Sequence, residues 1–401
     1  MILVNNVRSA RTILTLYGPI TYERTFLVAS NKEQSQKLYD TEGIRGVFPK
    51  DWALGIDRLP FKATYKMMAA VCREGVRAKS YAEAVINISE KYHVKISAKQ
   101  VEKITNYVGK VVWDDQRKKA DVSKATIGIR VDNRKRRRRK DDILYIEIDG
   151  AYVHVRDKQD GGSTKAAWTE SKHAIAFHSS DIHYWHKKNS DGEFNHRIEA
   201  KDCTGYIGSS DEFKYHLHSM AAENDCEHVS KVVFICDGAL WIKEIVEKYF
   251  PYATYILDLY HAKEHAGNFA RVAESDSVEA DKLADKLCDL IDAGKIEELL
   301  DAIRPYKEKK LPEGANFYTY VENHRSGMNY PYYREQGYFV GSGAVESANR
   351  YLMQNRLKLP GMRWNTSTAQ LMLSLKVKEE SGNWNSVISL LKEHFYGGGM
   401  A

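Results

Sequence analysis

The chain opens with two runs of β-branched and aromatic residues. In ARTILTLYGPITYERTFLV these runs flank the turn-forming pair Gly18 and Pro19. A strand, a tight turn and a second strand in direct succession are typical of a β-hairpin. The pattern therefore predicts a hairpin within the first 30 residues.

From Phe61 to about Lys119 the apolar residues recur at helical spacing. Ser80 is a good N-cap for a helix over SYAEAVINISEKY, Glu83 completes a capping-box pattern, and Ser97 is an N-cap before AKQVEKITNYVGKVVW. Two helices joined by the short connection YHVKI resemble a DNA-reading helix-turn-helix. An ordinary helical hairpin has the same pattern, so both interpretations stay open.

Strands and helices alternate beyond residue 142. The candidate strands are ILYIEIDGAYVHVR, as a long strand or hairpin interrupted at Gly150, then SKHAIAFHSSDI, HRIEAKDC, KVVFICD and ATYILD. Helices are predicted from Ser209 to Asn224, over ALWIKEIVEKYF and from Tyr260 onward. This succession predicts an α/β fold with a mixed sheet of five strands flanked by helices. Residues 262 to about 310 have a helical pattern without strands, and a late helix is predicted over AVESANRYLM.

The composition narrows the class of protein. A chain of 401 residues, 43% hydrophobic and 28% charged, suffices for two or three domains with sizeable cores. It has no apolar run long enough for a membrane span, and MILVNNVRSAR lacks a signal-peptide pattern. Its five cysteines are scattered and never form a C-x-x-C pair, which favours reduced thiols. We expect a cytoplasmic protein without a membrane partner.

Positive charge is concentrated in one segment. Lys and Arg outnumber Asp and Glu by 60 to 54, yet residues 121–140 alone have a net charge of +7. Most of the excess comes from one uninterrupted run: Arg134, Lys135, Arg136, Arg137, Arg138, Arg139 and Lys140. Such a run repels itself unless a polyanion neutralises it, so we expect it to contact DNA phosphates without reading sequence. A solvated linker, or a segment that binds another polyanion, is the alternative.

Three acidic residues are candidates for catalysis. Asp149 follows ILYIEI, Asp237 follows VVFIC, and Glu346 lies early in the late helix. A carboxylate at the end of a buried strand is costly unless it is paired or binds a cation. Carboxylate oxygens are preferred ligands of Mg²⁺, and two such ions can drive phosphoryl transfer. We therefore expect Asp149, Asp237 and Glu346 to hold two Mg²⁺ or Mn²⁺ ions.

Three sequence blocks carry a family resemblance. They are IEIDGAYVHVR, CDGALWIKEIVEKYFPYATYILDLYHAKEH and GSGAVESANRYLMQNRLKLPGMRWN. Together with TILTLYGPITYERTF and SYAEAV near the start, they make nearly the whole chain resemble the ISLre-type insertion-sequence transposases of the Mutator-like DDE group. The resemblance implies a ribonuclease H-like fold whose metal-binding triad maps onto Asp149, Asp237 and Glu346. It also implies an all-α insertion between Asp237 and Glu346, and more sequence before the hairpin than this chain has.

The patterns and the resemblance together predict four parts: a β-hairpin and helical DNA-binding region at 1–120, a basic linker at 121–142, a ribonuclease H-like catalytic domain at 143–262 and 335–401, and a helical insertion at 263–334.

Further residues have candidate roles around the carboxylates. Asp258 and His261 form a D-x-x-H pattern that the resemblance places beside the active site, where His261 would contact a scissile phosphate or orient a water. Helix capping by Asp258 with local packing of His261 is the alternative. After Glu346, four basic residues suit DNA phosphates, with a solvated helix face as the alternative: Arg350, Arg356, Lys358 and Arg363. Trp364 is favoured as a packing residue over a base-stacking one.

These observations predict a DDE transposase. It would bind the terminal inverted repeats of an insertion sequence, nick the ends, and transfer the 3′-hydroxyls to target DNA by two-metal-ion phosphoryl transfer. The alternatives are a nuclease of the same fold without strand transfer, and a domesticated DNA-binding protein without catalysis. Pairing of two element ends would require a homo-oligomer. We also expect the protein to be associated with the bacterial nucleoid.

Overall fold

The computed structural model describes residues 3–43, 45–57, 59–128, 139–158, 163–188, 194–310 and 316–397. The chain forms two compact units. The first comprises Met1–Asp115, Ser374–Glu379 and Asn383–Ala401, and the second comprises Gln116–Leu373 and Glu380–Gly382.

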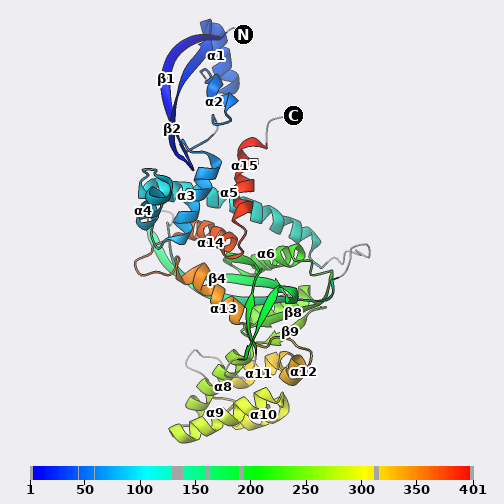
Figure 1. Ribbon diagram of the computed structural model, residues 1–401. Helices are drawn as coiled ribbons and strands as arrows, with labels where there is room; N and C mark the ends of the chain where they lie inside the picture. The colour runs from blue at the N-terminus through cyan, green and yellow to red at the C-terminus, as the bar shows by residue number, and fades with distance from the viewer. Residues whose placement is uncertain are drawn as a thin grey trace. The chain divides into compact units, whose positions relative to one another are not determined.

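The first unit begins with the hairpin that the sequence predicts. Strands β1 (Leu3–Thr15) and β2 (Gly18–Ala29) pair in antiparallel register up to Thr15 and Gly18 (Figure 1). Gly18 has a φ of +101°, a conformation that glycine adopts without strain. Helices α1 (Lys32–Glu42) and α2 (Pro49–Ala53) pack against β2. The predicted hairpin is confirmed.

Three further helices follow in the order that the periodicity indicates: α3 (Tyr65–Arg77), α4 (Tyr81–Tyr92) and α5 (Ala98–Thr126). Ser80 Oγ accepts from the Glu83 N–H at 3.1 Å, and Ser97 Oγ accepts from the Gln100 N–H at 3.2 Å, which confirms both N-caps. The Glu83 carboxylate turns back to the N–H of Lys79, one residue before the expected partner. A DNA-reading role for these helices stays a prediction.

The chain returns to the first unit at its C-terminal end. Helix α15 (Trp384–Tyr396) packs on α3, where Trp384 is buried and the Arg73 guanidinium lies 5.5 Å from its ring centre. The predicted catalytic domain includes residues 335–401, whereas this packing joins Asn383–Ala401 to the first unit.

The second unit is built on a mixed sheet of five strands (Figure 1). In the order β7-β4-β3-β8-β9, its strands are β7 (Asp202–Ile207), β4 (Thr164–His178), β3 (Arg139–Lys158), β8 (Val229–Cys236) and β9 (Thr254–Leu257). The pairs β7-β4 and β4-β3 are antiparallel, and β3-β8 and β8-β9 are parallel. The predicted mixed α/β sheet is confirmed.

Two details of the predicted strands are wrong. The edge strand expected in HRIEAKDC is β7, a few residues later, and Phe194–Ile198 forms β6, which pairs with β5 (Ile182–Lys188) in a separate small sheet. No interruption occurs at Gly150, which stays paired with Lys172 inside the long strand β3. Pairing with β4 along this length outweighs the weak strand propensity of a single glycine.

The sheet separates two layers because successive side chains of a strand point to opposite faces. Leu144, Ile146 and Ile148 of β3 join the apolar core beneath α6 (Ser210–Glu223) and α7 (Leu240–Tyr249). Glu147 and Asp149 therefore point to the other face, which α13 (Gly343–Asn349) covers. The alternation thus directs two acidic side chains toward one helix.

Helices account for the rest of the second unit. They are α8 (Leu259–Ala273), α9 (Ser277–Asp292), α10 (Ile296–Ile303), α11 (Phe317–His324), α12 (Tyr330–Glu335) and α14 (Thr366–Glu380), the last of which crosses into the first unit. As expected, residues 262–310 contain helices and no strand. Among the described residues, no helix is both long and apolar enough to cross a membrane.

Candidate active site

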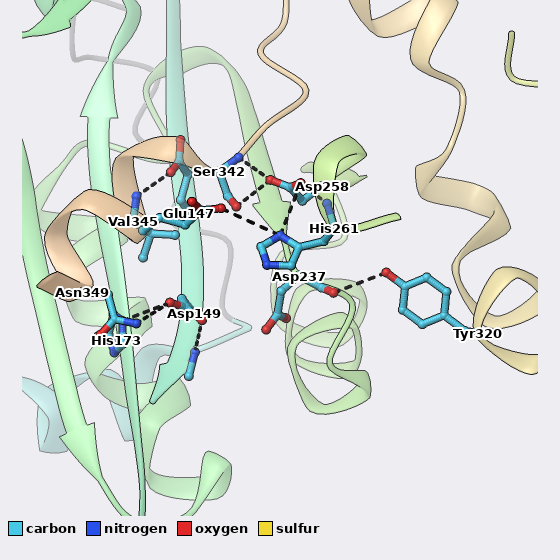
Figure 2. A network of polar contacts seen from close by, with 12 residues as sticks. Glu147, Asp149, His173, Asp237, Asp258, His261, Tyr320, Ser342, Val345 and Asn349 are labelled. Atoms are coloured by element: carbon cyan, nitrogen blue, oxygen red, sulfur yellow. Dashed lines mark hydrogen bonds and ion pairs between the residues drawn. The ribbon is translucent and has the colours of Figure 1, made fainter. Parts of the chain in front are cut away.

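Three aspartates lie side by side where the parallel strands end. Ile148 pairs with Cys236, and Cys236 pairs with Leu257, as the last residue pairs of β3-β8 and β8-β9. The next residues along the three strands are Asp149, Asp237 and Asp258. Asp149 does not end its strand as the sequence suggested, since β3 runs on beside β4. Asp149 lies at the point where β8 ends, so β8 does not pair with β3 beyond it and this edge of β3 faces the site (Figure 2).

Asp149 is held by three neighbours on different elements. Its Oδ1 accepts from the Gly150 N–H at 2.7 Å, its Oδ2 accepts from the Asn349 side chain at 2.8 Å, and the ring of buried His173 lies 3.6 Å away (Figure 2). Burial opposes ionisation, but His173 and the two hydrogen bonds outweigh it and lower the pKa of Asp149. This carboxylate is therefore ionised and oriented at neutral pH.

Asp237 is half-buried among like charges. Its Oδ1 accepts from the Ala239 N–H at 3.0 Å, across Gly238, which has a φ of +91°. A Cβ at Gly238 would lie 2.8 Å from the ring of Tyr320, so only glycine fits this turn. Burial and the charge of Asp149 raise the pKa of Asp237. The charge of His261 lowers the pKa of Asp237 but does not offset these two effects.

Asp258 connects two helices. Its Oδ1 caps α8 by accepting from the His261 N–H at 2.8 Å, and its Oδ2 accepts from the N–H and the hydroxyl of Ser342 at 2.5 and 2.6 Å (Figure 2). Asp258 is fully buried, yet these hydrogen bonds and His261 outweigh the effect of burial and lower its pKa. Asp258 therefore fixes the start of α8 against the segment that leads into α13.

His261 is the cation of this cluster. Its Nδ1 lies 3.3 Å from Oδ1 of Asp258 and 4.0 Å from Oε1 of Glu346. The hydrogen bond with Asp258 and the surrounding carboxylates raise the pKa of His261 to about 9, against the effect of its burial. The ring is charged at neutral pH. The capping and active-site interpretations of this D-x-x-H pattern both agree with the geometry, because the cap holds His261 beside Glu346.

Glu346 reaches the cluster from α13, and its side chain is 55% exposed. Two contacts orient the helix: the Val345 N–H donates to Oε2 of Glu147 at 2.8 Å, and Asn349 donates to Asp149. Burial and the charges of Asp258 and Asp149 raise the pKa of Glu346, although His261 opposes the shift. Glu346 therefore lies within electrostatic reach of the strand-end carboxylates.

Sequence reasoning missed Glu147, which lies two residues before Asp149. It is buried, and burial raises its pKa to about 8, so most of it is protonated at neutral pH. The signal was present in the spacing, since residues i and i+2 of a strand share a face. Asn349 and Ser342 were missed as well, because only the packing of α13 shows which residues they touch.

The cluster has two candidate sets of metal ligands. Among the described residues, the donor atoms of Asp258, His261 and Glu346 lie within 4.8 Å of one another. Both Asp258 oxygens already accept hydrogen bonds and His261 is protonated, so this set is an ion-paired group. Asp149, Asp237 and Glu346 instead offer hard oxygen donors, and burial together with neighbouring carboxylates raises the pKa of the last two, a penalty on ionisation that a divalent cation would relieve.

The predicted DNA-contacting residues occupy different environments. Arg350, Lys358 and Arg363 are exposed, as contact with phosphate requires. Arg356 is only 2% exposed, and its guanidinium lies 5.3 Å from the ring centre of buried Trp364, so its predicted contact with DNA is not supported. The packing interpretation of Trp364 is the one that its burial favours. Arg134, Lys135, Arg136, Arg137 and Arg138 lie outside the described residues, and the side chains of Arg139 and Lys140 are not described.

A family model of the Uncharacterised protein family (UPF0236) matches residues 3–392. The chain belongs to this family. No curated protein matches its sequence. Among solved structures, the chain is similar to one from the Drosophila P element transposase strand transfer complex, at 9% identity over 91% of this chain and 87% of that chain. The TM-score is 0.26, which is too low to demonstrate a shared fold.

Proposed function

We propose that this UPF0236 protein is a DDE transposase that nicks the ends of an insertion sequence and transfers the 3′-hydroxyls to target DNA. The proposal is carried by Asp149 within β3, Asp237 after β8 and Glu346 on α13, because the charge of Asp149 acts on both of the other carboxylates. Two of these carboxylates have a raised pKa, as expected for a site that awaits a cation.

The topology supports the proposed class of fold. Three antiparallel strands followed by two parallel ones agree with the ribonuclease H-like sheet that the resemblance to ISLre-type transposases implies. Helices α8 to α12 lie between Asp237 and Glu346 in sequence, where that resemblance implies an all-α insertion. We retain 263–334 as the proposed insertion.

The chain's own residues have separable roles in the proposed reaction. Asn349 and His173 orient Asp149, while Asp258 holds the start of α8 beside Ser342. The His261 cation lies where it can position an anionic phosphate close to Glu346. Two Mg²⁺ or Mn²⁺ ions held by Asp149, Asp237 and Glu346 would supply activation of the nucleophile and stabilisation of the leaving oxygen.

DNA contacts in the proposal come from exposed cations. Arg350, Lys358 and Arg363 follow Glu346 in sequence, and arginine forks suit phosphate oxygens. The basic run at residues 134–140 adds contacts that do not depend on base sequence. Pairing of two element ends would require a homo-oligomer.

The decisive experiment incubates the purified protein with Mg²⁺ or Mn²⁺ and labelled DNA from the ends of the element that encodes it. Nicked and joined products are scored separately. Asp149→Asn, Asp237→Asn and Glu346→Gln should each reduce both products to background while DNA affinity stays roughly unchanged. The matched control is Asp301→Asn, at a side chain that is 69% exposed in a surface ion pair.

The outcomes separate the alternatives. Nicks without joined products would identify a nuclease that lacks strand transfer. Specific end binding without any product would identify a DNA-binding protein that has lost catalysis. If one carboxylate variant keeps wild-type nicking, that residue is not a ligand and the assignment of the triad fails.

A further inference from the structure

A cavity of about 850 Å³ opens beside Glu346 in the second unit. Glu147 and Glu346 line its end nearest the candidate site. Aromatic side chains from β4, β5, β6, the start of α8 and the segment before α13 line part of its other walls: Phe177, Tyr184, His196, Tyr260, Tyr338 and Phe339. The proposed chemistry uses only Glu346 among the cavity residues, so the aromatic walls lack a role.

Several of the aromatic rings contact one another. Phe339 stacks on His196 with ring centres 4.8 Å apart and planes 21° from parallel, and Tyr184 lies 5.8 Å from His196. Tyr260 lies over Gly341, where an added Cβ would come within 2.6 Å of the ring. Tyr184 is 51% exposed and Tyr260 is 52% exposed. Aromatic faces suit planar, polarisable groups.

The charges around the cavity narrow the class of ligand. Lys201 and Arg334 also line it, and their ion pairs with Glu380 and Asp292 leave both groups partly exposed. A ligand with a planar ring and a phosphate would use both the aromatic walls and these cations. A wholly apolar ligand would leave the cations and Glu346 without a function.

We propose that the cavity receives a base of an unpaired DNA strand next to the phosphodiester at Glu346. The inference rests on the proposed function, since a phosphate held at Glu346 brings its own nucleotide to the cavity mouth. A base inside a duplex is stacked on its neighbours and cannot enter, so the DNA must be locally unpaired there. Stacking on Tyr184 and Tyr260 offsets part of the cost of unpairing.

The test measures binding in EDTA by fluorescence anisotropy, so that no nicking occurs. The probes are a labelled single-stranded oligonucleotide of about 12 nucleotides and the same strand with abasic sites at its centre. Wild-type protein should bind the base-bearing strand about 5- to 150-fold more tightly for each stacked base. Tyr184→Ala and Tyr260→Ala should each reduce this ratio, whereas Tyr332→Ala, a partly exposed tyrosine that does not line the cavity, should keep it.

Two further comparisons separate this inference from the proposed function. Equal affinity of wild-type protein for both strands overturns the inference, even if the same preparation nicks end DNA. A base preference that depends on Tyr184 and Tyr260 supports it, even if no nicking is found. Deoxyadenosine monophosphate has the same planar ring and phosphate, so it should displace the strand only in large excess. Displacement at a concentration equal to that of the strand would assign the cavity to free nucleotides and overturn the inference.

Discussion

Asp51 in the first unit is a buried carboxylate whose neighbours are cations. Asp237 in the second unit is a half-buried carboxylate with acidic neighbours. Asp51 is 2% exposed and accepts hydrogen bonds from Arg11 at 2.6 Å, from Arg24 and from Tyr22 at 2.5 Å. Burial opposes its ionisation, yet these partners lower the pKa of Asp51. Its charge is compensated entirely by the chain.

Asp237 has the reverse environment. Its side chain accepts a hydrogen bond from the backbone N–H of Ala239. Burial raises the pKa of Asp237, and the negative charges of Asp149 and Glu170 raise it further. The comparison shows how a structural carboxylate differs from a candidate functional one. The first has cations that outweigh the effect of burial, whereas the second has only the charge of His261, which burial and the nearby carboxylates outweigh.

The largest expected effect is on Asp51. Asp51→Asn should lower the free energy of unfolding of the first unit by about 3–5 kcal/mol, because it leaves two largely buried guanidiniums without their anion. Urea unfolding of the variant measures this loss, with Asp301→Asn as the exposed control. A loss no larger than that of the control would mean that Arg11 and Arg24 are solvated in the absence of Asp51.

Divalent cations should act only on the second aspartate. Mg²⁺ at about 100 times its dissociation constant should stabilise the wild-type protein by roughly 2.7 kcal/mol, and EDTA should reverse the gain. Asp237→Asn should lose this response, while Asp51→Asn should keep it. Thermal unfolding with and without Mg²⁺ measures the difference, and an equal response in the Asp237 variant would contradict the predicted ligand.

In the absence of metal, Asp237→Asn and Asp51→Asn should change the free energy of unfolding in opposite directions. Removing a poorly compensated charge should raise stability by about 0.5–2 kcal/mol, the range that single stabilising substitutions commonly give. The amide oxygen can still accept from the Ala239 N–H. Destabilisation in EDTA, measured by thermal unfolding, would show that Asp237 has a stabilising partner in the apo protein.

The smallest expected effects concern how the free energy of unfolding depends on pH. The two aspartates should change it on opposite sides of pH 3.8, the ordinary pKa of an aspartate. The pKa of Asp51 is lowered, so its stabilisation is complete above 3.8 and disappears as pH falls through the folded value. The pKa of Asp237 is raised, so its penalty is complete at higher pH and disappears as pH falls toward 3.8. The free energy of unfolding of each Asn variant relative to wild type, measured between about pH 2 and 7, should show these separate windows. Coincident windows would remove the distinction between the two sites.

Local patterns predicted much of the fold. The hairpin, the N-caps at Ser80 and Ser97 and the five-stranded mixed sheet follow from periodicity and capping chemistry, which act over a few residues. The position of β7 and the continuity of β3 through Gly150 were missed, since both depend on pairing with β4. Register between strands is a tertiary property that the spacing within one strand does not contain.

The sequence by itself determined the kinds of group available to the site and their order along the chain: carboxylates after apolar strands, a D-x-x-H pattern and a later glutamate. Only the tertiary structure decided their orientation, their contacts and their pKa values. It directed Glu147 and Asp149 to one face of β3, set His261 beside Glu346, and buried Arg356 under Trp364. The reason is physical: the pKa of a group and its availability to a ligand depend on burial and on charges brought close by packing, and those neighbours lie far away in sequence.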